Sequence, residues 1–172
     1  MNDVVFVNDE NLPVGAGTID DAVRHGYALR IARVILINEK GEWLLQRRSS
    51  TIRMPLLWNE SATGHVDVGE TDMQAAAREM KEEIGAEGVA LSEVGSLYLE
   101  EPRDGLIKKS FHTLYVGVFN GVVTIDTSEV SEVRWIAPRE LRVWMTSAPQ
   151  DFTVGALLAL EFFMKTMRTP LT

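Results

Sequence analysis

The sequence predicts an α/β fold of the α+β type, an α/β/α sandwich around a mixed β-sheet. Three observations lead to this prediction. Several β-prone runs are separated by turn residues, one amphipathic helix with clear end signals lies near the middle of the chain, and a periodic apolar helix lies near its end. Strands and helices mixed in this way bury their apolar faces against one another in layers.

The N-terminal part of the chain predicts a hairpin, a short helix and a second hairpin. Residues 4–8 are β-prone and precede a turn at residues 10–13. Thr18, followed by Ile19-Asp20-Asp21, predicts a capped helix that ends near Gly26. The β-prone run 29–37 then turns at residues 38–41 and returns as a strand over residues 43–47.

The central helix is predicted by its end signals. Thr71 and Gln74 form a capping box, and Gly85 is placed to end the helix in a left-handed conformation. Helical spacing predicts an apolar stripe that packs on the sheet, made of Met73, Ala77, Met80 and Ile84. Three glutamates are predicted on the side away from this stripe: Glu79, Glu82 and Glu83.

Beyond this helix, residues 89–101 and 107–119 predict two strands around a Pro-Arg-Asp-Gly turn. Asn120-Gly121 is the strongest short hairpin signal in the chain. Residues 133–136 predict a last strand, and Pro138 a helix start. The final helix is predicted over residues 152–168, with inward positions at Phe152, Leu157, Leu160 and Met164. We expect one domain over residues 1–172, with an N-terminal hairpin region (1–26), a core (27–146) and the C-terminal helix (152–168).

Composition excludes several classes of function. The net charge of −8 argues against a surface that coats nucleic acid or binds an anionic membrane. The chain has no cysteine, which excludes a disulfide, a thiolate nucleophile and a cysteine-type zinc site. The N-terminus lacks the pattern of a signal peptide, and no apolar run approaches the roughly 20 residues of a membrane span. We therefore expect a cytoplasmic protein.

The spacing of charged residues and glycines over residues 64–86 indicates chemistry. Gly64 precedes Glu70 by six residues, and Glu70 precedes Arg78 by eight; the chain then reads Arg-Glu-apolar-x-Glu-Glu-x-Gly-apolar up to Ala86. Carboxylates three and four residues apart on a helix repel one another. Three such glutamates alone would be a solvated acidic face, but they also suit Mg²⁺, which takes carboxylate, water and phosphate oxygens together.

This pattern resembles the Nudix box, the signature of Mg²⁺-dependent pyrophosphohydrolases that act on a nucleoside diphosphate linked to another group. The resemblance implies that Glu79, Glu82 and Glu83 carry Mg²⁺, or Mn²⁺ as a substitute, with the carbonyl of Gly64 as a further ligand. Either Glu79 or Glu82 would accept the proton of the attacking water. It further implies structural roles for four other residues of the box: Glu70, Arg78, Gly69 and Gly85. Glu70 and Arg78 would form a carboxylate–guanidinium pair. Gly64 and Gly69 suit a loop with unusual backbone angles.

Residues outside the box are candidates with two interpretations each. Glu129 is either an additional catalytic glutamate, which binds metal or activates water, or a solvated loop carboxylate. The arginines near the box either grip a phosphate or lie on the surface: Arg47, Arg48 and Arg53. Trp58 either stacks on a base or is a core residue. His65 follows the box glycine and is placed to reach the substrate; we assign it no proton transfer.

The segments around the box resemble the Nudix branch that contains type I isopentenyl-diphosphate isomerases and hydrolases of similar length. The isomerase depends on a cysteine where this chain has Thr63, and on histidines where it offers Arg30. A non-catalytic nucleotide-binding module is a third alternative, but such proteins usually lose box glutamates. The expected partner is a small diphosphate substrate, not nucleic acid or a membrane, with a homodimer left open.

Overall fold

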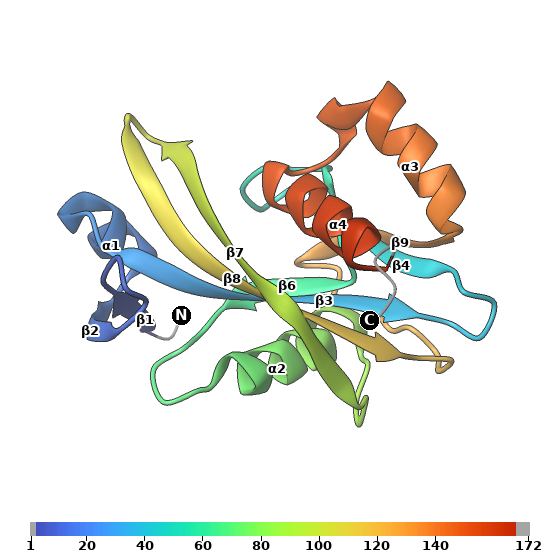
Figure 1. Ribbon diagram of the computed structural model, residues 1–172, viewed down its shortest axis with the longest axis horizontal. Helices are drawn as coiled ribbons and strands as arrows, with labels where there is room; N and C mark the ends of the chain where they lie inside the picture. Colours follow the sequence, from blue (N-terminus) through green and yellow to red (C-terminus); the bar gives the residue numbers. More distant parts are fainter. Residues whose placement is uncertain (1–2, 168–172) are drawn as a thin grey trace.

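The computed structural model describes residues 3–167 and contains, over that range, one mixed sheet and four α-helices (Figure 1). The strands are β1 Val4–Val7, β2 Pro13–Gly17, β3 Ala28–Ile37, β4 Trp43–Arg48, β5 Trp58–Asn59, β6 Ala62–His65, β7 Leu91–Arg103, β8 Leu106–Val118 and β9 Val130–Ile136. The helices are α1 Ile19–His25, α2 Asp72–Ile84, α3 Pro138–Ser147 and α4 Val154–Thr166, with a 3₁₀ turn over Pro149–Asp151.

Strand β3 is the centre of the sheet. It runs parallel to β8 from the pair Ala28–Lys109 to the pair Ile37–Val118, and antiparallel to β1 and β6. Strand β4 leaves β3 through a turn and pairs antiparallel with β5 and β9. Strands β7 and β8 form a long antiparallel ribbon that crosses the molecule, and its tip lies on the side of α1 (Figure 1).

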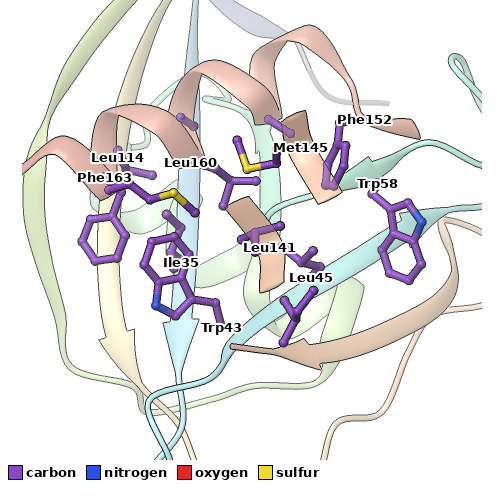
Figure 2. Packing of buried hydrophobic residues seen from close by; sticks show 14 residues of the cluster. Ile35, Trp43, Leu45, Trp58, Leu114, Leu141, Met145, Phe152, Leu160 and Phe163 are labelled. Atoms are coloured by element: carbon purple, nitrogen blue, oxygen red, sulfur yellow. The ribbon is translucent and has the colours of Figure 1, made fainter. Parts of the chain in front are cut away.

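The two faces of β3 divide the core into two layers. Ala32, Val34 and Leu36 pack with the buried side of α2. Ile35 points the other way and packs with α3 and α4 in a cluster that also holds residues of β4 (Figure 2). This alternation is the period of two that any strand imposes. Helix α2 therefore covers one face of the sheet and α3 and α4 the other, which confirms the predicted sandwich (Figure 1).

Helix α2 has the predicted ends but a different rotation. The capping box at Thr71 is present, and Gly85 ends the helix with φ of 67°. Met80 and Ile84 of the predicted apolar stripe are buried, but Met73 and Ala77 are exposed. The buried residues are Ala75, Ala76, Met80, Glu83 and Ile84. Small alanines fit the close approach of helix and sheet, so Glu83 also turns inward instead of lying away from the core.

Three other predictions need correction. Asn120-Gly121 makes no hairpin: β8 is followed by a loop, and β9 pairs with β4. The Asn120 side chain instead accepts a hydrogen bond from the backbone N–H of Glu39, 2.7 Å away. Strand β7 continues through Pro102 and Arg103, so the turn narrows to two residues. The last helix begins at Val154, and Leu157 is only partly buried.

The starts of the other helices agree with the predictions. Thr18 caps α1, and Pro138 opens α3. Residue 168, the predicted end of the last helix, lies outside the described residues. Over residues 3–167, no helix is both long and apolar enough to cross a membrane. The single-domain organisation stays a prediction.

Candidate active site

Arg78 connects the loop before α2 to the glutamates on it. Its guanidinium donates two hydrogen bonds to Glu70, at 2.8 and 2.9 Å, and a third to the carbonyl oxygen of His65 at 3.0 Å. The pair lowers the pKa of Glu70. The same guanidinium also donates to Glu79 at 2.6 Å and to Glu82 at 3.2 Å. Paired forks of this kind fix both partners, so Arg78 positions the loop, as the sequence predicted, and two of the glutamates as well.

Glu83 is the most buried glutamate of α2, with 5% of its surface exposed. It accepts hydrogen bonds from the side chain of Gln46 at 2.7 Å and the backbone N–H of Thr63 at 3.0 Å. Burial raises its pKa well above the usual value, and the nearby charge of Glu79 raises it further. Burial also raises the pKa of Glu79 to about 7, in spite of Arg78. Positive charge brought to these carboxylates would lower both pKa values.

Gly64 leaves the space that Glu79 occupies. A Cβ atom at position 64 would lie 1.9 Å from Oε1 and 2.0 Å from Cδ of Glu79. Gly64 lies in β6 and does not have a positive φ, so the predicted need for unusual backbone angles is wrong there. Its role is close approach. The prediction is correct for Gly69, whose φ is 87°.

A cavity of about 610 Å³ lies above these residues. This is the size range of a site for a small molecule. Its lining carries acidic residues from α2 and the loop before β9: Glu79, Glu82, Glu83 and Glu129. Three predicted substrate-binding residues also line it: Arg48, Arg53 and His65. Their roles stay proposals, but the fold brings them to the glutamates across long stretches of chain.

Two predicted substrate-binding residues lie elsewhere. Trp58 is 5% exposed and packs in the core (Figure 2). Its ring centroid lies 5.2 Å from that of Trp144, so the base-stacking interpretation is wrong. Arg47 does not line the cavity. It donates to the carbonyl oxygen of Leu56 at 3.0 Å and pairs with Glu132 at 3.5 Å. Strand alternation turns Arg47 away from Arg48, which faces the cavity.

Sequence reasoning missed a buried polar network beside the cavity. Arg33 forms a salt bridge with Glu60 and donates from Nε to Nδ1 of His112 at 2.7 Å. His112 in turn contacts the hydroxyl of Ser110 at 2.7 Å. A Cβ at Gly155 would lie 2.0 Å from Nη2 of Arg33, so α4 offers a notch for the guanidinium. One feature of the sequence could have indicated this network: Arg33 is a charged residue within a β-prone run.

The comparisons identify the family. The model of the NUDIX domain matches residues 28–154. The chain belongs to the Nudix family. This Nudix protein is 30% identical over 162 residues to an isopentenyl-diphosphate Δ-isomerase of Nocardia farcinica, covering 92% of each chain. It is 29% identical to the uncharacterized Nudix hydrolase YfcD of Escherichia coli K12, covering 94% of this chain and 86% of the other.

Solved structures share the fold of this Nudix protein. DR0079 from Deinococcus radiodurans superposes with a TM-score of 0.70 at 22% identity, over 84% of this chain and 89% of the other. The NUDIX domain of NrtR from Shewanella oneidensis, complexed with ADP ribose, gives a TM-score of 0.65 at 16% identity, over 81% and 88% of the chains. Family membership makes the protein a hydrolase of the class that acts on pyrophosphate bonds.

Proposed function

We propose that the protein is a Mg²⁺-dependent pyrophosphohydrolase that cleaves the diphosphate of a nucleoside diphosphate derivative by attack of water. The observation that carries the proposal is the set of four glutamates that line the 610 Å³ cavity, three from α2 and one from the loop before β9, with Gly64 leaving the space that Glu79 occupies. Arginines line the same cavity and suit a phosphate-bearing substrate.

The donor set fits a hard divalent cation. Glu79, Glu82 and Glu83 would hold Mg²⁺, or Mn²⁺ in its place, together with the carbonyl oxygen of Gly64. Over residues 3–167, no three acidic or histidine side chains already form a metal-binding group, and Arg78 contacts two of the glutamates. Arg78 donates to Oε1 of Glu79 and Oε2 of Glu82, which leaves the second oxygen of each carboxylate available to a metal ion. The metal would neutralise phosphate charge and promote ionisation of water.

Side chains of the protein accept the proton of the attacking water and bind the substrate phosphates. Glu79 or Glu82 accepts the proton of the attacking water, and Glu129 faces the same cavity from the opposite loop. Arg48, whose charge interacts with those of Glu83 and Glu129, binds phosphate oxygens of the scissile diphosphate. Arg53 lines the same cavity beside Asp104, at the tip of the β7–β8 ribbon. Burial raises the pKa of Glu79 to about 7, so it binds a proton readily near neutral pH. Activity is therefore expected to rise towards mildly alkaline pH, as metal binding and the base both need the carboxylate form.

Isomerisation of isopentenyl diphosphate is the second candidate, favoured by the names of five relatives. The chain has no cysteine, and Thr63 stands where the resemblance places that thiol. A neutral hydroxyl is a poor substitute in proton transfer to carbon. Arg30, at the expected histidine position, donates to Asn11 at 2.8 Å and does not line the cavity. Hydrolysis is therefore the better-supported function, while a cytoplasmic location and a homodimer stay predictions.

Both reactions can be tested on one preparation. A panel of nucleoside diphosphate derivatives with Mg²⁺ in ¹⁸O water should release a nucleoside monophosphate, with label on one phosphate product. Isopentenyl diphosphate should give no dimethylallyl diphosphate. Excess chelator should abolish hydrolysis, and undiminished turnover in chelator would contradict the metal requirement. Isomer formed faster than any hydrolysis product would reverse the assignment.

A further inference from the structure

The cavity has a basic end that the diphosphate chemistry does not use. The basic residues that line this end come from the turn after β4, from β3 and from the tip of the β7–β8 ribbon: Arg33, Arg53, Arg103 and Lys108. They gather in a protein whose net charge is −8. Glu101 lines this end too, so the feature that matters is which of the four cations already has an acidic partner.

The arginines at this end are already paired. Arg33 is bound to Glu60 inside the core. Arg103 contacts Asp20 of α1 at 2.6 Å and Asp104 at 3.8 Å. Arg53 contacts Asp104 at 3.4 Å. Asp104 therefore links Arg53 to Arg103 and holds the two guanidinium groups at the tip of the ribbon.

Lys108 differs from these arginines, because its ammonium group forms no hydrogen bond or salt bridge within residues 3–167. Its neighbour across the ribbon is Glu101, in register on β7, whose charge favours the protonated ammonium group although the two side chains form no salt bridge. Burial lowers the pKa of Lys108 to about 8. Even so, the group is mostly protonated at pH 7. Strand alternation places Lys108 on the same face of β8 as Ser110 and His112, and this face lies towards Arg33.

A second polar group at this site also lacks a partner. Nε2 of His65 is buried and forms no hydrogen bond within the described residues, although His65 lines the cavity. Buried polar atoms in folded proteins are nearly always hydrogen-bonded. Two polar groups in one cavity, the Lys108 ammonium group and Nε2 of His65, therefore have no hydrogen-bond partner among the described residues. A phosphate bound there would accept a hydrogen bond from the ammonium group.

We propose that Lys108, with Arg53 and Arg103, binds a second anionic group of the substrate, a phosphomonoester distant from the diphosphate that is cleaved. This inference rests on the proposed hydrolase function and narrows its substrate class to nucleoside diphosphate derivatives with an additional phosphate. The glutamate end would hold the scissile diphosphate through metal, and the basic end would hold the extra phosphate directly. A dianionic phosphate matches an unpaired ammonium group flanked by guanidinium groups.

Lys108→Met is the decisive variant and Lys109→Met its matched control. Lys109 is the next residue of β8, contacts Asp9 at 3.4 Å and does not line the cavity, so the control removes the same charge from the other face. Lys108→Met replaces a half-buried ammonium group that makes no salt bridge within residues 3–167 with an apolar side chain of similar length, so we expect the variant to fold. Thermal unfolding of both variants checks this point.

The first measurement is binding of inorganic phosphate to the full chain by calorimetry, with chelator present so that no metal contributes. Lys108→Met should weaken binding about 10- to 100-fold, the scale of a lost hydrogen bond to a charged group. Lys109→Met should stay within about twofold. Equal phosphate affinity of wild type and Lys108→Met would overturn the proposal.

The second measurement compares substrates that differ by one phosphomonoester: NADPH with NADH, and coenzyme A with dephospho-coenzyme A. In each pair that the enzyme hydrolyses, the kcat/KM of wild type should be about tenfold or more higher for the substrate with the additional phosphate. Lys108→Met should lower kcat/KM for that substrate alone, so that the two kcat/KM values become nearly equal. An unchanged ratio would refute the substrate class while leaving the hydrolase function intact. Hydrolysis of no diphosphate in a broad panel would refute the hydrolase function, and the phosphate titration would still decide the subsite.

Discussion

Gly64→Ala tests the close approach of β6 and Glu79. The added Cβ would lie 1.9 Å from Oε1 of Glu79, whereas an ordinary contact is about 3.4 Å or more, so the carboxylate must move by about 1.5 Å. Displacement of a catalytic group by about 1 Å costs on the order of 10²-fold in rate. The obstructed atoms belong to the far end of a flexible side chain, and Gly64 has no positive φ. We therefore expect about a 100-fold loss of kcat/KM with less than about 1 kcal/mol lost from the free energy of unfolding.

The assay is steady-state hydrolysis with saturating Mg²⁺, alongside urea unfolding of the same samples. A shorter acid at position 79 leaves room for the methyl group, so Gly64→Ala combined with Glu79→Asp should lose less activity than the two single losses multiplied together. Such non-additivity is the mark of direct contact. Gly64→Ala with activity within twofold of wild type would refute the reasoning, and so would strictly multiplicative losses in the double variant.

Three further predictions follow from the same structure. Glu82→Gln should lower kcat about 10²–10⁴-fold without unfolding the protein, because Glu82 is largely exposed; Glu87→Gln, which changes another exposed carboxylate near the end of α2, should leave kcat unchanged, and equal rates for all three proteins would show that the glutamates are only solvated. Met80→Ala should cost about 2–5 kcal/mol in urea unfolding and exposed Met73→Ala less than about 0.5 kcal/mol; the reverse order would mean that α2 is rotated otherwise. The folded pKa of Lys108, about 8, lies below its unfolded value of 10.5, so the unfolded chain binds more protons between these values. Wild type should therefore be less stable than Lys108→Met below pH 8, by up to about 3 kcal/mol. This gap should narrow towards pH 10, and a gap independent of pH would contradict the desolvation of the ammonium group.

Local signals predicted the elements of the fold better than their pairing. The capping box at Thr71 and the glycine at 85 fix the two ends of α2, because at each end the hydrogen-bonded groups lie within five residues of one another. The parallel pairing of β3 with β8 joins residues about 80 positions apart, and no local signal specifies it. The Asn120-Gly121 hairpin failed for the same reason: the side chain of Asn120 meets a distant turn, and that contact replaced the local preference.

The site was predictable as far as it lies on one helix. Spacing alone brought Glu79, Glu82 and Glu83 together, but it placed Ala77 against the sheet and Glu83 outside. Alanine occupies positions 75, 76 and 77, so no difference in size or polarity marks which of them faces inward. The basic end of the cavity was not predictable. Arg33 and His112 are 79 residues apart, and Lys108 stands beside Lys109 with no sequence feature that says which of the two turns inward.

The long ribbon has a consequence for self-association. Over residues 3–167, strand β7 pairs only with β8, so its outer edge offers unpaired backbone groups over much of 13 residues. Open edges of this length invite another strand and lead to aggregation. Here the register shifts between Glu93 and Gly95, and Pro102 lacks an N–H near the tip. The backbone hydrogen bonds to a strand from a second molecule would be interrupted at both points, and that strand would meet the charges of Glu93 and Glu100. This edge is therefore protected against fibril-like addition, and contacts between copies should form on other surfaces.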